Sequence, residues 1–405
     1  MRNEKDDAPV VGDAKKPRDI SEAYEVMHTP SIFSSARRIP TLDYTLQNIF
    51  MSLATLVVAT ASLILTSAVI LPLSLLRSVL PKQMLMQKGA DVVEAKGKVV
   101  LIVGASRGIG MEVLKTYVPE PGTTVIAVSK NTAPHNFKYR SLPSNLILMY
   151  DNADFLRNAL ITLGDTPATL QMATIDLSAN HKEIARAITE LDKTYGPITH
   201  LYAIAGISNH LKDSSPWGLV RITLSKRNPT RELTGFFEMQ DVTEKMIQVN
   251  VSGITAVAMS MYECMKERQY GKICIVGSVA GIYAPSNMIS YASTKSFLNT
   301  FSTSLRTLAA AYNVDVVTIQ PGFIDTRMTK KMRGQGSTLM SSEFNSAEEI
   351  AKRMKSAVEK GGVGVMTWPT RQSVMMYGFK GLNPICDELG RYISMKGGMG
   401  GKKIT

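Results

Sequence analysis

The chain has 405 residues, of which 44% are hydrophobic and 20% charged, and its formal net charge is +12. This length and composition are typical of a globular protein with a full core, and three cysteines exclude a disulfide framework and a paired-cysteine metal site. The positive charge favours anionic partners such as a phosphorylated cofactor or a membrane surface, whereas the lack of a basic patch interleaved with aromatic residues argues against nucleic acid.

The amino-terminal residues 1–43 mix charges of both signs with several prolines and sustain no apolar period. Such a composition does not bury enough apolar surface to fold on its own. We therefore predict a disordered or loosely attached tail.

Residues 44–76 contain no Asp, Glu, Lys or Arg, and about 20 apolar residues are enough to cross a bilayer. We predict a membrane segment here, followed by a linker over 77–96. A buried core helix is the alternative. Because Pro72 can stop or kink a helix, a hairpin or an in-plane helix also stays open. The cations that follow the segment (Arg77, Lys82 and Lys88) outnumber those before it (Arg37 and Arg38), which favours a cytoplasmic domain downstream.

Strands alternate with helices from residue 97 onward, which predicts βαβ units and a Rossmann-type doubly wound parallel sheet, an α/β fold. The stretch 99–118 is predicted to form a strand, a glycine-rich turn and a helix. Further strands are predicted over 124–130, 170–177, 198–206, 272–278, 313–322 and 363–368, and further helices over 182–195, 242–268, 289–311 and 347–359. We assign 97–370 to one catalytic domain with insertions near 131–168 (with a short helix at about 154–163) and 207–240, and 371–405 to a carboxyl-terminal extension.

The first turn of this domain contains Gly104, Gly108 and Gly110 between an apolar strand and an amphipathic helix. Glycines at this spacing let the backbone turn tightly and approach a pyrophosphate at the helix amino terminus. The alternative is a glycine-rich turn without a ligand.

A second pattern places Ser278 thirteen residues before Tyr291, and Lys295 four residues after that tyrosine. Residues four apart lie on one face of a helix, so Tyr291 and Lys295 can point into the same site. A phenol titrates near ~10, and a neighbouring ammonium should lower that pKa, so that the tyrosine can exchange a proton with a substrate oxygen. Alone, this spacing also fits a helix face that carries an aromatic ring and a solvated charge.

With these motifs in the same order, residues 97–335 resemble the short-chain dehydrogenase/reductase family, with a related tail to about 370. The resemblance implies hydride transfer between a nicotinamide and a carbonyl or alcohol carbon, with Tyr291 as the proton donor or acceptor and Ser278 orienting the substrate oxygen. Lys295 would lower the pKa of the tyrosine and bind ribose hydroxyls, and Asn250 would hold a water of the proton relay.

The same resemblance implies where the cofactor binds. Asp176 matches the residue that contacts the adenine, and Pro321, Gly322 and Thr326 match the element that holds the nicotinamide carboxamide. Two positions depart from the family pattern, since Val103 stands in place of a Thr and Ile204 in place of an Asn. The predicted cofactor residues are Gly104, Ser106, Arg107, Gly108, Ile109, Gly110, Ser129, Lys130, Asp176, Leu177, Ala205, Gly206, Tyr291, Lys295, Pro321, Gly322, Ile324 and Thr326. No metal site is predicted.

Charge at the end of the second strand bears on the choice of cofactor. An NAD site usually presents a carboxylate to the adenosine 2′-hydroxyl, whereas a 2′-phosphate needs a cation. Ser129 and Lys130 bring no acid there, and Arg107 lies inside the glycine turn. We therefore predict NADP as cofactor; alternatively, both cations are merely solvated.

Together these features predict a membrane-anchored, NADPH-dependent reductase of a lipophilic ketone such as a steroid, a keto-lipid or a retinoid. The expected partners are this substrate, the membrane and a second copy in a homodimer. We expect it in the endoplasmic reticulum or on lipid droplets, with the catalytic domain in the cytosol. Two alternatives stay open: an oxidising dehydrogenase that uses the same residues, and a catalytically inactive, membrane-tethered scaffold with the same fold.

Overall fold

The computed structural model describes residues 42–79, 97–130, 166–208, 240–284, 288–334 and 344–381. The predicted tail, most of both predicted insertions and the helix near 154–163 lie outside these ranges. The chain forms two units, Met1–Gln47 with Lys403–Thr405, and Asn48–Lys402. The sheet and the helices around it belong to the second unit.

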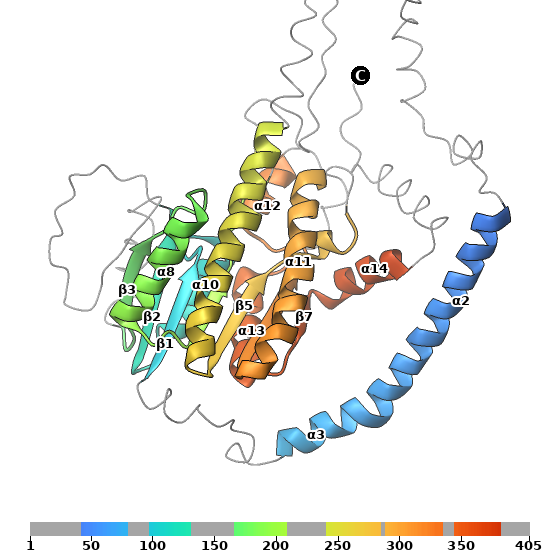
Figure 1. Ribbon diagram of the computed structural model, residues 1–405, viewed down its shortest axis with the longest axis horizontal. Coiled ribbons are helices and arrows are strands. Elements are labelled where there is room, and N and C mark those ends of the chain that lie inside the picture. Colours follow the sequence, from blue (N-terminus) through green and yellow to red (C-terminus); the bar gives the residue numbers. More distant parts are fainter. Residues whose placement is uncertain are drawn as a thin grey trace, which may run out of the picture. The chain divides into compact units, whose positions relative to one another are not determined.

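A sheet of seven strands forms the centre of this unit, in the order β3-β2-β1-β4-β5-β6-β7, and all neighbouring strands are parallel (Figure 1). The strands are β1 Lys98–Val103, β2 Thr123–Ser129, β3 Thr169–Thr174, β4 His200–Ala203, β5 Gly271–Val276, β6 Val314–Pro321 and β7 Val365–Trp368. Near-continuous runs of Val, Ile and Leu form such strands because both faces of a parallel sheet are covered. The predicted fold class is confirmed.

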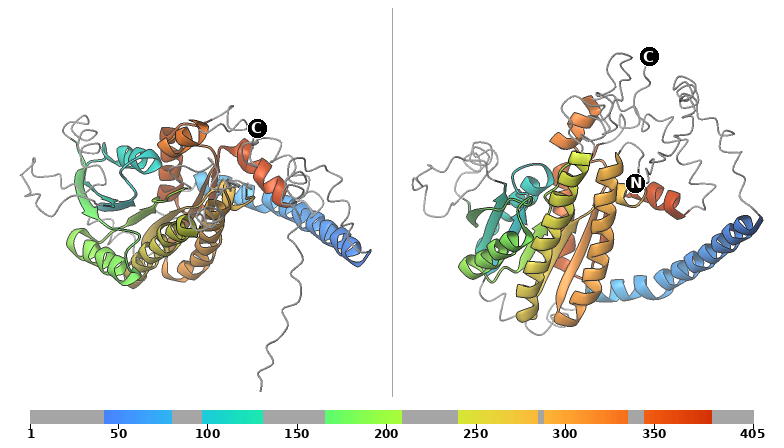
Figure 2. Two further views of the ribbon diagram at one scale, coloured as in Figure 1. Left: turned by 90° about the horizontal axis from the view of Figure 1, so that it is seen from above. Right: turned by 45° about the horizontal axis from the view of Figure 1, so that its top comes forward.

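Helices cover both faces of the sheet and bury one apolar layer on each (Figure 2). On one face lie α8 (His181–Tyr195), α10 (Ile254–Glu267) and α11 (Ile289–Ala309); on the other lie α6 (Gly108–Tyr117) and α13 (Ala347–Lys360). Each of these helices was predicted to within a few residues. Many of the predicted site residues lie in the loops that connect these helices to the strands.

The helix before β5 contains an irregularity that the sequence pattern did not predict. Residues 240–246 are α-helical, Ile247–Gly253 forms a π-helix (η3), and α10 continues from Ile254. π-helical turns occur frequently at functional sites. Here the π-helix contains Asn250, which is fully buried.

Two further helices, α12 (Arg327–Gly334) and α14 (Thr370–Gly381), were not predicted. The α14 helix packs against β7 and against the 3₁₀-helix η4 (Val279–Gly281), and the Tyr377 hydroxyl donates to Gln320 Oε1 at 2.7 Å. Its apolar residues run consecutively through 374–377, so they follow no helical period.

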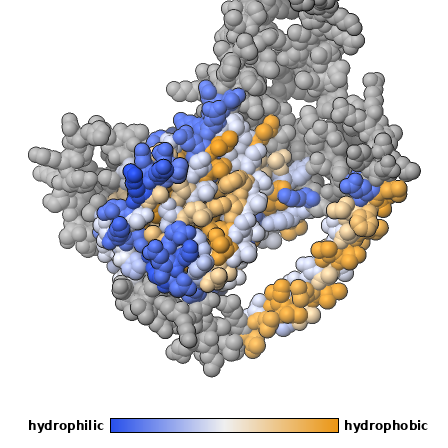
Figure 3. All heavy atoms as spheres, viewed as in Figure 1, coloured by the Kyte–Doolittle hydropathy of each residue, from blue (hydrophilic) through white to orange (hydrophobic). Residues whose placement is uncertain are grey.

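The charge-free segment forms one continuous helical run, α2 (Leu42–Leu65), the π-helix η2 (Thr66–Ile70) and α3 (Leu71–Val79), which passes through Pro72. Within the described residues, Thr45–Leu76 is the one helix long and apolar enough to cross a membrane, judged by length and composition alone. Apolar side chains line its exposed surface (Figure 3).

A polar network joins the amino-terminal edge of the sheet to the helices beside it. Lys98 at the start of β1 pairs with Glu359 at 2.8 Å and Glu120 at 3.0 Å, and the Tyr117 hydroxyl donates to Glu359 at 3.0 Å. Burial alone would raise the pKa of Glu359, but His200 and Lys98 outweigh it and hold that pKa well below its usual range. Glu359 therefore stays ionised and ties α13 to β1.

The strand order reverses between β1 and β4. From β1 the chain continues to β2 and β3 on one side, and from β4 it continues to β5, β6 and β7 on the other side. In open parallel sheets, ligands bind outside the carboxyl ends of the strands at this reversal. The predicted cofactor and catalytic residues follow the carboxyl ends of β1 to β6, so the topology brings them to one edge.

Candidate active site

The glycine turn after β1 is tightly folded against the end of β4. Gly104 has a φ of +99°, and a Cβ there would lie 2.7 Å from the backbone nitrogen of Ala205. A Cβ on Gly110 would collide with the carbonyl oxygen of Gly104. These positions therefore require glycine for close backbone approach, as the spacing predicted.

The turn opens the amino terminus of α6 toward the site. Arg107 is the N-cap residue and its side chain makes no capping hydrogen bond, while no acidic residue lies in the first helical turn. The N–H groups of such a terminus attract an anion. Ser106 and Ile109 lie in this same turn and first helical turn, as predicted, and Ile109 packs against the core.

Side chains at the ends of β2 and β3 meet, because these two strands are neighbours. Lys130 Nζ lies 2.9 Å from Asp176 Oδ2 and donates to Ser178 Oγ at 3.1 Å. Burial acts to raise the pKa of Asp176, but hydrogen bonds from Ser178 and Lys130 outweigh it and lower that pKa. The two residues that the sequence assigns to the 2′-phosphate and to the adenine thus pair with each other. Their neighbours Ser129 and Leu177 are buried.

Asn250 holds the segment after β4 with its side-chain amide. Its Oδ1 accepts from Ile207 N at 2.8 Å, and its Nδ2 donates to Ile207 O at 2.9 Å and to Thr294 Oγ1 at 3.2 Å. A Cβ on Gly206 would lie 3.4 Å both from Asn250 Oδ1 and from Lys295 Nζ. The predicted pair Ala205–Gly206 therefore lies between the glycine turn and α11.

Ser278, Tyr291 and Lys295 come together at the carboxyl end of β5. Ser278 Oγ accepts from Ala280 N at 3.1 Å and donates to Pro321 O at 3.3 Å, and its side chain is hydrogen-bonded to Tyr291. Lys295 Nζ donates to Val276 O at 2.8 Å and lies 5.8 Å from the centroid of the Tyr291 ring.

The pKa of Tyr291 differs from the sequence-based expectation. Burial raises the pKa of Tyr291 to about 12, and the hydrogen bond with Ser278 lowers it only in part. Burial also lowers the pKa of Lys295, to about 8. The expected lowering of the tyrosine pKa was wrong for this arrangement, because burial of the phenol has the larger effect. At neutral pH the phenol is protonated and can donate a proton.

The loop after β6 closes the site from the side of α14. Gly322 N donates to Trp368 O at 2.9 Å, and Phe323 N donates to Gln372 Oε1 at 2.7 Å. Ile324 is buried, and Thr326 lies against the glycine turn, 3.4 Å from where a Gly108 Cβ would stand. Gln372 is not among the residues predicted from the sequence, because α14 itself was not predicted.

These residues fit a dinucleotide. The glycines of the turn have no side chains that would keep a pyrophosphate away from the backbone. The amino terminus of α6 faces the same edge of the sheet, and the cations Arg107 and Lys130 flank that terminus. A small apolar cluster lies beside Tyr291 on the other side of the site: Ala280, Met288 and Ala292 are buried, and Phe323 and Phe344 pack against them. Among the described residues, no group of three or more His, Cys, Asp or Glu could hold a metal ion.

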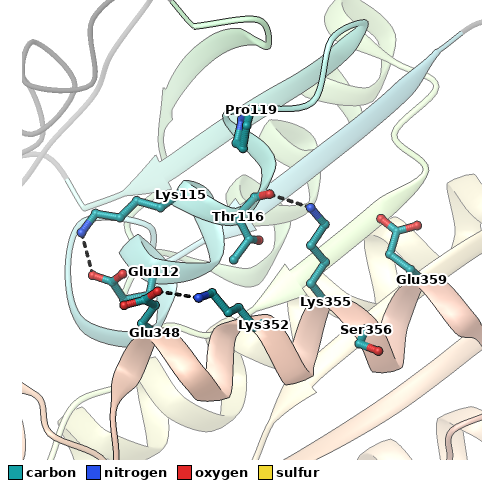
Figure 4. A pocket seen from close by; sticks show the side chains of 9 residues that line it. All are labelled: Glu112, Lys115, Thr116, Pro119, Glu348, Lys352, Lys355, Ser356 and Glu359. Atoms are coloured by element: carbon teal, nitrogen blue, oxygen red, sulfur yellow. Dashed lines mark hydrogen bonds and ion pairs between the residues drawn. The ribbon is translucent and has the colours of Figure 1, made fainter.

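A second concave surface, of about 640 Å³, lies between α6 and α13, away from these residues (Figure 4). Its charges neutralise each other, since Lys115 pairs with Glu112 at 2.8 Å and Lys352 with Glu348 at 2.6 Å. It contains none of the predicted site residues, so we assign it no part in the chemistry. Its lining consists of Glu112, Lys115, Thr116, Pro119, Glu348, Lys352, Lys355, Ser356 and Glu359.

Comparison with known proteins agrees with the fold. The family model for short chain dehydrogenases matches residues 138–336, which include Asn250, Ser278, Tyr291 and Lys295. The 3-oxoacyl-[acyl-carrier-protein] reductase FabG of Salmonella typhimurium is 25% identical over 239 residues, which are 58% of this chain and 78% of the relative. The dehydrogenase/reductase SDR family protein 7-like of Drosophila melanogaster is 24% identical over 307 residues, 74% of this chain and 80% of the relative.

A solved structure agrees in fold. The short-chain type dehydrogenase/reductase from Mycobacterium ulcerans has a TM-score of 0.51 at 19% identity and covers 67% of this chain and 88% of its own. Over residues 138–336 the chain matches the short-chain dehydrogenase/reductase family, and this match and the relatives support an NAD(P)-dependent oxidoreductase that acts between a ketone and an alcohol.

Proposed function

We propose that this protein is a membrane-attached, NADPH-dependent reductase of a lipophilic ketone such as a steroid, a keto-lipid or a retinoid. The observation that carries the proposal is the apolar cluster of Met288, Phe323 and Phe344 beside Tyr291 and Ser278. Both rings are half-buried, and an alkyl or steroid skeleton would cover the part of them that is still exposed, whereas a polar substrate would not. The Phe323 and Phe344 rings lie with their centroids 5.8 Å apart.

The proposed roles follow from the geometry. The bound nicotinamide supplies the hydride. Tyr291, whose phenol is protonated at neutral pH, donates a proton to the ketone oxygen. The Ser278 hydroxyl turns from Pro321 O to donate its hydrogen bond to that oxygen and so orients it. Lys295 brings a positive charge close to the developing alkoxide and to the ribose. Asn250 positions α11 through Thr294 and the chain after β4 through Ile207.

Attachment to a membrane is supported by the charge-free helix Thr45–Leu76 and by the excess of cations that follow it. We propose that the catalytic domain lies on the cytosolic side of the endoplasmic reticulum or of lipid droplets. A lipid-soluble ketone would be concentrated in either of these membranes.

Turnover of methyl ketones of increasing length tests the proposed substrate class. From butan-2-one to decan-2-one, we expect kcat/KM to rise by about fourfold for each methylene that the site buries. Phe323→Ala should flatten this rise, whereas Phe297→Ala, an exposed ring on α11, should not change it. A flat series in the wild type would contradict the lipophilic substrate. In fractionated cells, the activity should sediment with membranes and become soluble when residues 1–80 are removed.

Binding of the reduced cofactors tests the preference for NADPH. Lys130→Asp combined with Arg107→Ala should weaken NADPH at least ~30-fold, because a 2′-phosphate loses charge-assisted hydrogen bonds, and should weaken NADH by less than ~3-fold. The fluorescence of the reduced nicotinamide reports both affinities. Lys182→Asp on α8 is the matched control for an added negative charge. Equal weakening of both cofactors would contradict the assignment of the 2′-phosphate site.

A further inference from the structure

One face of α11 is attached to the ends of β5 and β6 by a series of polar side chains. Lys295 Nζ donates to Val276 O at 2.8 Å, and Arg306 Nε donates to Val316 O at 2.8 Å. Between them, Thr318 Oγ1 donates to Ser302 Oγ at 2.9 Å. Asn299 lies on this same face, one turn after Lys295 and two turns after Tyr291.

Asn299 contacts the backbone of the proposed catalytic serine. Its Nδ2 donates to Ser278 O at 3.0 Å, and the same carbonyl accepts from Gly281 N at 3.1 Å. The carbonyl of Ser278 is thus held by two donors, one from its own turn and one from α11. Tyr291 and the residue that holds Ser278 therefore belong to one helix.

The two glycines around Ser278 make room for this contact. A Cβ on Gly277 would collide with Asn299 Oδ1, and a Cβ on Gly281 would lie 2.8 Å from Asn299 Nδ2 and 2.5 Å from Ser296 N. Close approach of a backbone to a helix is a common reason for glycine at such positions. The Asn299 amide is therefore seated between Gly277 and Gly281.

The other end of this amide is unpaired. Asn299 Oδ1 is buried and has no hydrogen-bond partner among the described residues. A buried acceptor without a partner costs stability, and a single hydrogen bond of the Nδ2 group offsets only part of that cost. An asparagine here is therefore a poor choice for stability alone.

We infer that Asn299 is a positioning residue that sets the distance between the Ser278 hydroxyl and the Tyr291 phenol. The inference rests on the roles proposed above for Ser278 and Tyr291. When Asn299 holds the Ser278 carbonyl, the turn Gly277–Gly281 is kept in register with α11, and both hydroxyls face the same substrate oxygen.

Asn299→Asp tests this role, because the carboxylate keeps the shape of the amide but cannot donate to Ser278 O. With decan-2-one and NADPH at neutral pH, we expect kcat to fall ~10- to 100-fold, the cost of a misplacement of about 1 Å, with the affinity for NADPH unchanged. A protonated carboxyl does donate a hydrogen bond. With kcat expressed per folded protein, the ratio of variant to wild-type kcat should therefore rise as the pH falls. A merely structural role would leave the kcat of the folded protein unchanged at every pH.

Asn313→Asp is the matched control. Asn313 Nδ2 also donates to a backbone carbonyl at 3.0 Å, that of Gln269, and its Oδ1 is also buried without a partner among the described residues, but it lies beyond the far end of α11. This variant should keep the wild-type kcat and its pH profile.

Asn299→Leu distinguishes an effect on the position of Ser278 from an effect on the stability of the fold. This variant removes both the donor and the unpaired acceptor, so its melting temperature should stay within a few degrees of the wild type while its kcat falls as in Asn299→Asp. Wild-type kcat in either variant, or loss of activity only in proportion to unfolded protein, would overturn the inference. If Tyr291→Phe is also fully active, or the wild type reduces no ketone, the proposed function itself is wrong.

Discussion

Replacement of Tyr291 by Phe is expected to lower kcat for ketone reduction by roughly 100- to 10,000-fold, the usual contribution of a positioned general acid. The phenolic hydroxyl is the only part of the side chain that this change removes. Because burial raises the pKa of Tyr291 to about 12, the wild-type phenol holds its proton throughout the neutral range and is ready to donate it. Loss of absorbance of the reduced nicotinamide, with decan-2-one as substrate, measures the effect.

A matched variant makes this result specific. Tyr312→Phe removes the hydroxyl of a tyrosine just beyond the same helix, whose ring packs edge-on against Tyr262 with the centroids 6.3 Å apart. This variant should retain wild-type turnover and NADPH affinity. If Tyr291→Phe consumes NADPH like the wild type, the proton comes from another group, and the proposed role of Tyr291 is wrong.

Replacement of Lys295 by Met is expected to abolish most of the activity and, at the same time, to stabilise the fold. Lys295 is 3% exposed, and burial lowers its pKa from 10.5 to about 8. A shift of this size corresponds to a penalty on the order of 3 kcal/mol for keeping the charge in the folded state. Removing one preorganised charge from the site should lower kcat/KM roughly 100-fold or more.

The pH dependence of stability follows from the same shift. Below about pH 8 the lysine is protonated in both the folded and the unfolded state, so the full penalty is present. As the pH rises from 8 toward 10.5, the folded state releases the proton first and the penalty is relieved. The melting temperature of Lys295→Met should therefore exceed that of the wild type most at pH 7, with the difference shrinking toward about pH 10.

The lysine also shapes the activity profile. Since the ammonium loses its proton near pH 8, wild-type ketone reduction should decline above that pH, whereas Tyr291 remains protonated. Lys352→Met, which removes an exposed lysine of α13, is the control and should change the free energy of unfolding by less than about 0.5 kcal/mol. If Lys295→Met is less stable than the wild type at every pH, the buried ammonium does not destabilise the fold and the prediction is wrong.

The sequence was sufficient to predict the sheet, because its strands are buried apolar runs and the helices between them have a clear apolar period. It could not predict α14, whose apolar residues are consecutive, or the π-helix around Asn250, which follows from packing. The pairing of Lys130 with Asp176 depends on the neighbouring positions of β2 and β3 in space.

Burial explains why the sequence-based expectation for the pKa of Tyr291 was wrong. The spacing of Tyr291 and Lys295 correctly predicts that the two side chains are close, but it carries no information on how far water is excluded from them. Asn299 was not singled out, although two signals point to it: it continues the four-residue repeat after Lys295, and glycines flank Ser278 on both sides. The catalytic and cofactor roles of these residues stay predictions until the variants are measured.

The network of Lys98, Glu120 and Glu359 lies at the amino ends of the strands, at the opposite edge of the sheet from Tyr291. The contacts that tie α13 to β1 are therefore separated in space from the predicted site residues. Substitutions around Lys98 can then change the stability of the sheet without touching the predicted site. The loops at the carboxyl edge can then change toward new substrates while the sheet that carries them stays the same.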